Sequence, residues 1–128
     1  MDEKLCNAES SASLAANQDT VYRIGSITKM FTATMLEQLV EAGKLQLSDP
    51  VEKYFPEVNT ILNRYKDASP VTLLQLATHT SGLSREPDHT DKYVKGEPEV
   101  WRQTLIAALP HVGYEFKPGE KYSYSNIG

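Results

Sequence analysis

Several residue types and patterns are scarce in this 128-residue sequence, and each absence excludes a class of protein. A single cysteine, Cys6, excludes an intrachain disulfide and a zinc site built from cysteines. No apolar run is long enough to span a bilayer, and the net charge of −4 offers no basic surface to a nucleic acid. His79, His89 and His111 lack the close spacing of metal ligands, and no glycine-rich phosphate loop occurs. We therefore expect no metal, no cofactor, no nucleic-acid partner and no membrane span.

The composition is that of an ordinary globular protein, with 40% hydrophobic and 23% charged residues in a length that suits one domain. Residues 1–20 are small and polar without a clear period, and we interpret them as a loose N-terminal arm. Residues 21–128 then form the domain. The first residues lack the apolar stretch of a signal peptide. Because an export signal is removed from a mature protein, the native compartment stays open.

Hydrophobic spacing and capping residues predict a mostly helical domain with few or no paired strands. The first helix ends at Gly43, while Asp49 and Thr72 are the expected N-caps of the second and third. The helices are predicted over 26–42, 50–55, 73–79 and 98–109, and a short β-prone run over 21–24.

Ser26 and Lys29 form the first candidate pair for chemistry. An offset of three residues places both side chains on one face of a helix. Serine is a weak nucleophile, and a neutral lysine amine one turn away can take its proton. By itself the pair also fits a helix-capping serine with a solvated lysine.

Tyr124 and Asn126 form the second candidate pair. Alternate residues of an extended segment point to one side, so a phenol and a carboxamide would face a common ligand. By itself this pair also fits a surface loop with a half-buried tyrosine.

With their surroundings, the two pairs resemble the serine β-lactamase and DD-peptidase superfamily. The likeness is to the branch with class C β-lactamases, related carboxylesterases and penicillin-binding-protein-like hydrolases. It covers about residues 21–128. Four landmarks occur in the family's order: 22–29 with Ser-x-x-Lys, 43–51, 72–83 with Thr-His-Thr-Ser-Gly-Leu, and 116–128 with a Pro-Gly turn before Tyr-x-Asn.

The resemblance implies a role for each motif residue. Ser26 is the acylated nucleophile, and its backbone N–H is one oxyanion donor. Lys29 is the base that activates Ser26. Tyr124 is the second acid/base, which protonates the leaving nitrogen, and Asn126 orients the substrate amide. The resemblance gives His79 a structural role at a helix end.

The resemblance also sets the expected fold class: mainly α, the helical domain of this fold, with most of the α/β sheet domain lacking. The family's third motif, Lys-Thr-Gly or His-x-Gly on a sheet-edge strand, comes after the tyrosine motif. Two residues follow Asn126 here. The second oxyanion donor belongs to the same strand. The apolar surface that would meet the sheet predicts self-association as a homo-oligomer.

The implied function is a serine hydrolase that opens β-lactams through a Ser26 acyl-enzyme, with a small β-lactam or ester as its partner. Three alternatives stay open: a non-catalytic or weakly active helical-domain fragment, an esterase or DD-peptidase-like hydrolase, and a helical protein-interaction module. Relatives of this kind suggest a periplasmic or secreted location, and a cytoplasmic one stays open as well.

Overall fold

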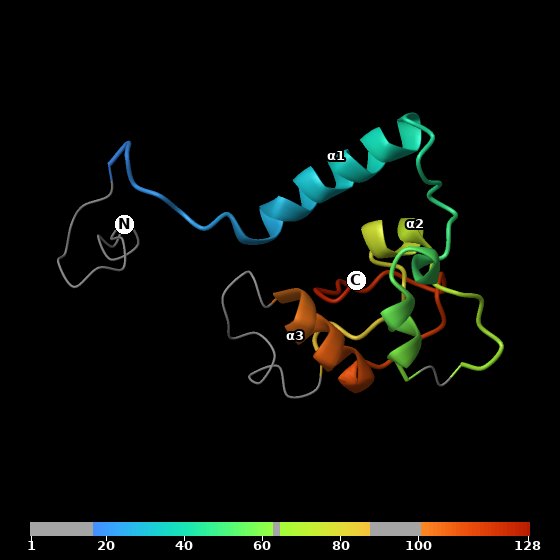
Figure 1. The fold of residues 1–128 in the computed structure, drawn as a ribbon. Coiled ribbons are helices and arrows are strands. Elements are labelled where there is room, and N and C mark those ends of the chain that lie inside the picture. The colour runs from blue at the N-terminus through green and yellow to red at the C-terminus, as the bar shows by residue number, and fades with distance from the viewer. Residues whose placement is uncertain (1–16, 63–64, 88–100) are drawn as a thin grey trace. The chain divides into compact units, whose positions relative to one another are not determined.

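The computed structural model of the protein describes residues 17–62, 65–87 and 101–128 (Figure 1). The chain divides into two units, Met1–Met35 and Leu36–Gly128. Each unit is described by itself.

The predicted helix over 26–42 is confirmed. A 3₁₀ turn, η2, spans Gly25–Ile27, and α1 follows it without a break over Thr28–Glu41. Gly25 has a φ of +54°, a left-handed conformation that glycine adopts readily. This residue turns the extended chain into the helical path that carries the first candidate pair.

The β-prone run over 21–24 does not form a strand, which agrees with the expectation of few or no paired strands. A strand requires a neighbour to accept its backbone hydrogen bonds, and the described part of the first unit offers none. In that unit, taken by itself, Met30, Phe31 and Met35 keep 63% to 69% of their surface exposed. The predicted self-association stays a prediction.

Gly43 ends α1 as predicted, through a Schellman motif. Its φ is +65°. The N–H of Gly43 donates to the carbonyl of Val40 at 2.9 Å, and the N–H of Lys44 donates to the carbonyl of Leu39 at 3.0 Å. Both bonds satisfy carbonyls that the last turn of a helix leaves without a partner.

The second predicted helix, over 50–55, is only a 3₁₀ turn, η3, over Val51–Lys53. Its N-cap is Pro50 and no side chain caps it, so the prediction of Asp49 as an N-cap was wrong. The carboxylate of Asp49 instead accepts hydrogen bonds from the backbone N–H of Gln46 and the hydroxyl of Tyr54. These two hydrogen bonds join Asp49 to one residue before it and one residue after it in the chain.

The predicted cap of the third helix is confirmed. In α2, Leu73–Ala77, the N–H of Gln75 donates to the hydroxyl oxygen of Thr72, and the N–H of Thr72 donates back to Oε1 of Gln75. This reciprocal pair is a capping box. The helix ends at Ala77 rather than at residue 79, because His79 adopts a left-handed backbone with φ +56°.

The fourth predicted helix, over 98–109, corresponds to α3, Trp101–Ala108, and residues 98–100 lie outside the described part of the chain. Its end is a 3₁₀ turn, η7, over Leu109–His111. Pro110 therefore tightens the helix end into another turn, and Leu109 is buried there.

The core of the second unit is a cluster of apolar side chains from η3, η7 and the loops, with a further 3₁₀ turn, η4 (Pro56–Thr60), packed nearby. Burying such side chains is the main favourable term in folding. The buried members are Val51, Ile61, Val71, Leu83, Leu109, Val112 and Tyr114.

Backbone pairing in the described residues is limited to isolated bridges, with no strand. These bridges join Pro50 to Thr72, Leu62 to Gly113 and Leu83 to Tyr114. Within residues 17–62, 65–87 and 101–128, no helix has the length and apolar character needed to cross a membrane. The same residues contain no group of three metal-ligating side chains, while Cys6 and His89 lie outside them.

Candidate active site

Ser26 and Lys29 lie in the first unit, on one helical path. Ser26 is in η2, and Lys29 is in the first turn of α1. The residue between the two elements, Thr28, has helical φ and ψ of −52° and −32°. Because the path is continuous, the two side chains lie one turn apart on one face. Ser26 is exposed and Lys29 is half-buried.

Tyr124 and Asn126 lie in the second unit, on a C-terminal segment that is hydrogen-bonded to His79, just after α2. The N–H of Ser123 donates to the carbonyl of His79 at 2.9 Å, and the N–H of Ser125 donates to Nδ1 of the His79 ring at 3.3 Å. His79 therefore accepts hydrogen bonds from the residues before and after Tyr124.

Ser125, between the two candidate residues, is fully buried. Its hydroxyl donates to the carbonyl of Ser84 at 2.8 Å and accepts from the N–H of Gly128 at 2.9 Å. With Ser125 turned inward, Tyr124 is half-buried and Asn126 is exposed. This alternation agrees with the extended segment that the sequence predicts.

The ring of Tyr124 has an aromatic and a cationic neighbour. The His79 ring is 4.4 Å from it between centroids, with 32° between the planes. Cζ of Arg85 is 5.2 Å from the Tyr124 centroid. A guanidinium at this distance is attracted to the face of an aromatic ring. The Tyr124 ring is therefore held by contacts with both His79 and Arg85.

Asn126 is held by the loop after α2. Its backbone N–H donates to the carbonyl of Arg85 at 2.9 Å, and its Nδ2 donates to Oε1 of Glu86. The sequence analysis singled out neither Arg85 nor Glu86. Their distance of about 40 residues from Asn126 leaves no local pattern, although both follow the Thr-His-Thr-Ser-Gly-Leu landmark.

The two candidate pairs belong to different units. Each pair is described within its own unit, and their joint action in one site remains what the family resemblance implies.

Two ionisable groups of the second unit, Asp49 and Tyr114, have clearly shifted pKa values. Hydrogen bonds from Tyr54, Gln46 and Lys53, in that order, lower the pKa of Asp49 to about 2. Burial raises the pKa of Tyr114. Tyr114 also lines a cavity of about 170 Å³ whose walls contain no residue of the candidate pairs. Both groups are therefore better explained as structural than as part of the site.

Comparison with solved structures defines the class of fold. The chain resembles a D-stereospecific amidohydrolase from Streptomyces sp., with 38% identity and a TM-score of 0.62 over 83% of this chain and 33% of that one. It also resembles a β-lactamase/D-alanine carboxypeptidase from Yersinia pestis, with 34% identity and a TM-score of 0.64 over 82% of this chain and 30% of that one. These are serine β-lactamase/DD-peptidase folds, a class of hydrolases.

Residues 7–128 match the β-lactamase family, and the chain belongs to that family. A D-alanyl-D-alanine-carboxypeptidase/endopeptidase, AmpH, from Escherichia coli is 36% identical over 85% of this chain and 28% of its own length. The β-lactamase-like protein 4 of Dictyostelium discoideum is 35% identical over 86% of this chain and 20% of its own. The chain thus spans 20–28% of the length of these two relatives.

The predicted resemblance is confirmed by this family membership. The predicted fold class is confirmed in its coarser form, since the described residues are helices and loops of a partial β-lactamase fold. The family is one of hydrolases that act on small molecules. The roles of the four motif residues stay proposals.

Proposed function

We propose that the chain carries the nucleophile of a serine hydrolase that opens β-lactams through an acyl-enzyme on Ser26. The observation that carries this proposal is the continuous path from η2 into α1, with the Lys29 amine one turn beyond an exposed Ser26. Such a pair supplies the two groups that acyl transfer needs, a hydroxyl and a base to take its proton.

Acylation begins with a proton transfer from Oγ of Ser26 to Nζ of Lys29. Oγ then attacks the carbonyl carbon of the substrate, and the carbonyl oxygen becomes an oxyanion. The backbone N–H of Ser26 donates a hydrogen bond to this oxyanion, an interaction that strengthens as negative charge develops there. The bond from carbon to nitrogen breaks and leaves an ester on Ser26.

Tyr124 completes this step as the second acid/base. Its hydroxyl gives a proton to the leaving nitrogen, and the resulting phenolate recovers a proton from Lys29 or water. In hydrolysis of the ester, the Tyr124 hydroxyl relays a proton from water to the Lys29 amine while the water oxygen adds to the carbonyl carbon. Lys29 returns this proton to Oγ of Ser26 as the ester bond breaks. Asn126 donates a hydrogen bond from Nδ2 to the substrate amide. Nδ2 carries two N–H donors, so one can bind the substrate while the other keeps its bond with Glu86.

Peptides that end in D-amino acids are the second candidate substrate class. The names of two similar proteins favour it, a D-alanyl-D-alanine-carboxypeptidase/endopeptidase and a D-stereospecific amidohydrolase. The same residues would serve both classes, because each reaction transfers an acyl group from nitrogen to Ser26.

Intact-protein mass spectrometry after incubation with a penicillin tests the proposal. The expected result is an increase equal to the whole penicillin mass, since opening the ring loses no atoms. Ser26→Ala should abolish the adduct, while Ser48→Ala, a change of another exposed serine, should keep it. An unmodified wild-type chain that also leaves the penicillin unhydrolysed would reject the proposed nucleophile and favour a non-catalytic fragment or an interaction module.

Two further assays separate the substrate classes. Turnover of a chromogenic cephalosporin indicates a β-lactamase, whereas release of D-alanine from a peptide ending in D-Ala-D-Ala indicates a carboxypeptidase. Solution mass measured in the same buffer tests the predicted self-association.

A further inference from the structure

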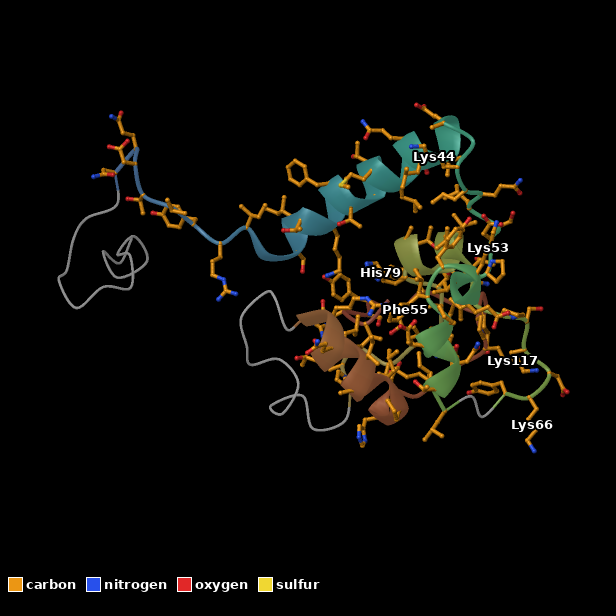
Figure 2. The ribbon with its side chains drawn as sticks, in the orientation of Figure 1. Lys44, Lys53, Phe55, Lys66, His79 and Lys117 are labelled. Atoms are coloured by element: carbon orange, nitrogen blue, oxygen red, sulfur yellow. The ribbon has the colours of Figure 1, made fainter. Side chains whose placement is uncertain are left out.

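His79 occupies an unusual position at the end of α2 (Figure 2). The N–H of His79 donates to the carbonyl of Leu76 at 3.2 Å, and the N–H of Thr80 donates to the carbonyl of Gln75 at 2.9 Å. This is a Schellman motif with His79 at the left-handed position, where glycine is the usual residue. Among the described residues, His79 is the only non-glycine residue with a positive φ.

The requirements of the helix end do not explain a histidine there. Glycine would adopt a φ of +56° without the steric cost that a Cβ brings. Residues held in such conformations persist when other contacts fix them, and they often serve a site. A side-chain function therefore offers a reason for histidine at this position.

Three contacts of the His79 ring lead to the segment 122–125. Nδ1 accepts the N–H of Ser125 at 3.3 Å, which requires the proton of a neutral ring to lie on Nε2. The ring packs against Tyr124 at 4.4 Å and meets Tyr122 edge-on at 6.0 Å between centroids. The backbone carbonyl of His79 binds the N–H of Ser123 as well.

We propose that His79 is a positioning residue that fixes Tyr124 by holding the Ser125 amide through Nδ1 and the phenol ring through its own ring. The importance of this role for catalysis rests on the proposed function, in which Tyr124 passes protons. A proton donor displaced by about 1 Å can lose about 100-fold in rate. The backbone bond from Ser123 does not depend on the side chain, so it provides an internal control.

Amide hydrogen exchange by NMR on the full chain tests the positioning without any activity. In His79→Gly, the left-handed turn is retained, so exchange at Ser123 and Thr80 should stay within about threefold of wild type. Exchange at Ser125 should accelerate at least tenfold. His79→Asn keeps an acceptor oxygen near the place of Nδ1 and tolerates the left-handed region. It should restore slow exchange at Ser125.

The same variants are then compared in penicillin acylation. His79→Gly should acylate at least tenfold more slowly at saturating penicillin, and His79→Asn should recover to within about threefold of wild type. His111→Asn, a change of another histidine in the same unit, should act like wild type. A saturating concentration separates loss of proton transfer from loss of binding.

Unchanged exchange at Ser125 in His79→Gly would overturn the proposal, whatever the activity. So would an acylation rate in His79→Gly equal to wild type, or a His79→Asn variant that protects Ser125 without recovering the rate. If the wild-type chain neither forms an adduct nor hydrolyses the penicillin, the proposed function fails by itself, and the exchange at Ser125 decides the positioning role.

Discussion

Replacing Gly82 by alanine should destabilise the second unit by two separate effects. Gly82 has a φ of +78°, a region that costs an L-residue about 1–2 kcal/mol. A Cβ at this position would also stand 3.2 Å from the carbonyl carbon of Phe116 and closer still to its oxygen. The neighbouring backbone resists a shift, because the N–H of Glu115 donates to the Gly82 carbonyl at 2.8 Å and Leu83 bridges to Tyr114.

Gly43 provides the matched control for the size of the second effect. Its φ of +65° carries the same conformational cost, but a Cβ there meets nothing within 4 Å. Overpacking of a close-packed site typically costs about 1–3 kcal/mol. We therefore expect Gly43→Ala to lower the free energy of unfolding by about 1–2 kcal/mol. Adding the overpacking cost, we expect Gly82→Ala to lower it by about 2–5 kcal/mol.

Urea denaturation followed by the fluorescence of Trp101, the single tryptophan, measures the difference. With a urea slope of about 1.5 kcal/mol per molar, the midpoint of Gly82→Ala should lie about 1 M below that of Gly43→Ala. Equal midpoints for the two variants would refute the steric argument, since only the clash with Phe116 distinguishes them.

Two further predictions concern the capping box and the Asp49 turn. Thr72→Ala should lower the free energy of unfolding by about 1 kcal/mol because α2 loses an N-cap acceptor. Thr72→Ser, which keeps the acceptor, should stay near wild type in the same urea titration. For Asp49, the folded pKa of about 2 lies below the ordinary 3.8, so its contribution is present above about pH 4 and is lost as the pH falls towards 2. The urea midpoint of wild type should therefore fall more between pH 4 and pH 2 than that of Asp49→Asn, and parallel falls would contradict the assignment.

The sequence predicted those parts of the fold that are decided within one or two helical turns. The helix after Gly25, its end at Gly43 and the capping box of Thr72 all rest on contacts between residues at most five apart. The same local reasoning failed for Asp49. A carboxylate before a proline fits an N-cap, but Tyr54 and Gln46 provide it with better hydrogen bonds.

The candidate site likewise combines features that local sequence determines with contacts that tertiary packing determines. By itself, the sequence determined the family, the pairing of Ser26 with Lys29 on one helical face and the alternation of Tyr124 with Asn126, because motif spacing and backbone period are local properties. Only the tertiary structure decided what holds Tyr124. The bond from Ser125 to His79 joins residues 46 positions apart, and the left-handed backbone of His79 depends on how α2 ends. Contacts of that range arise from packing, which no spacing in the sequence records.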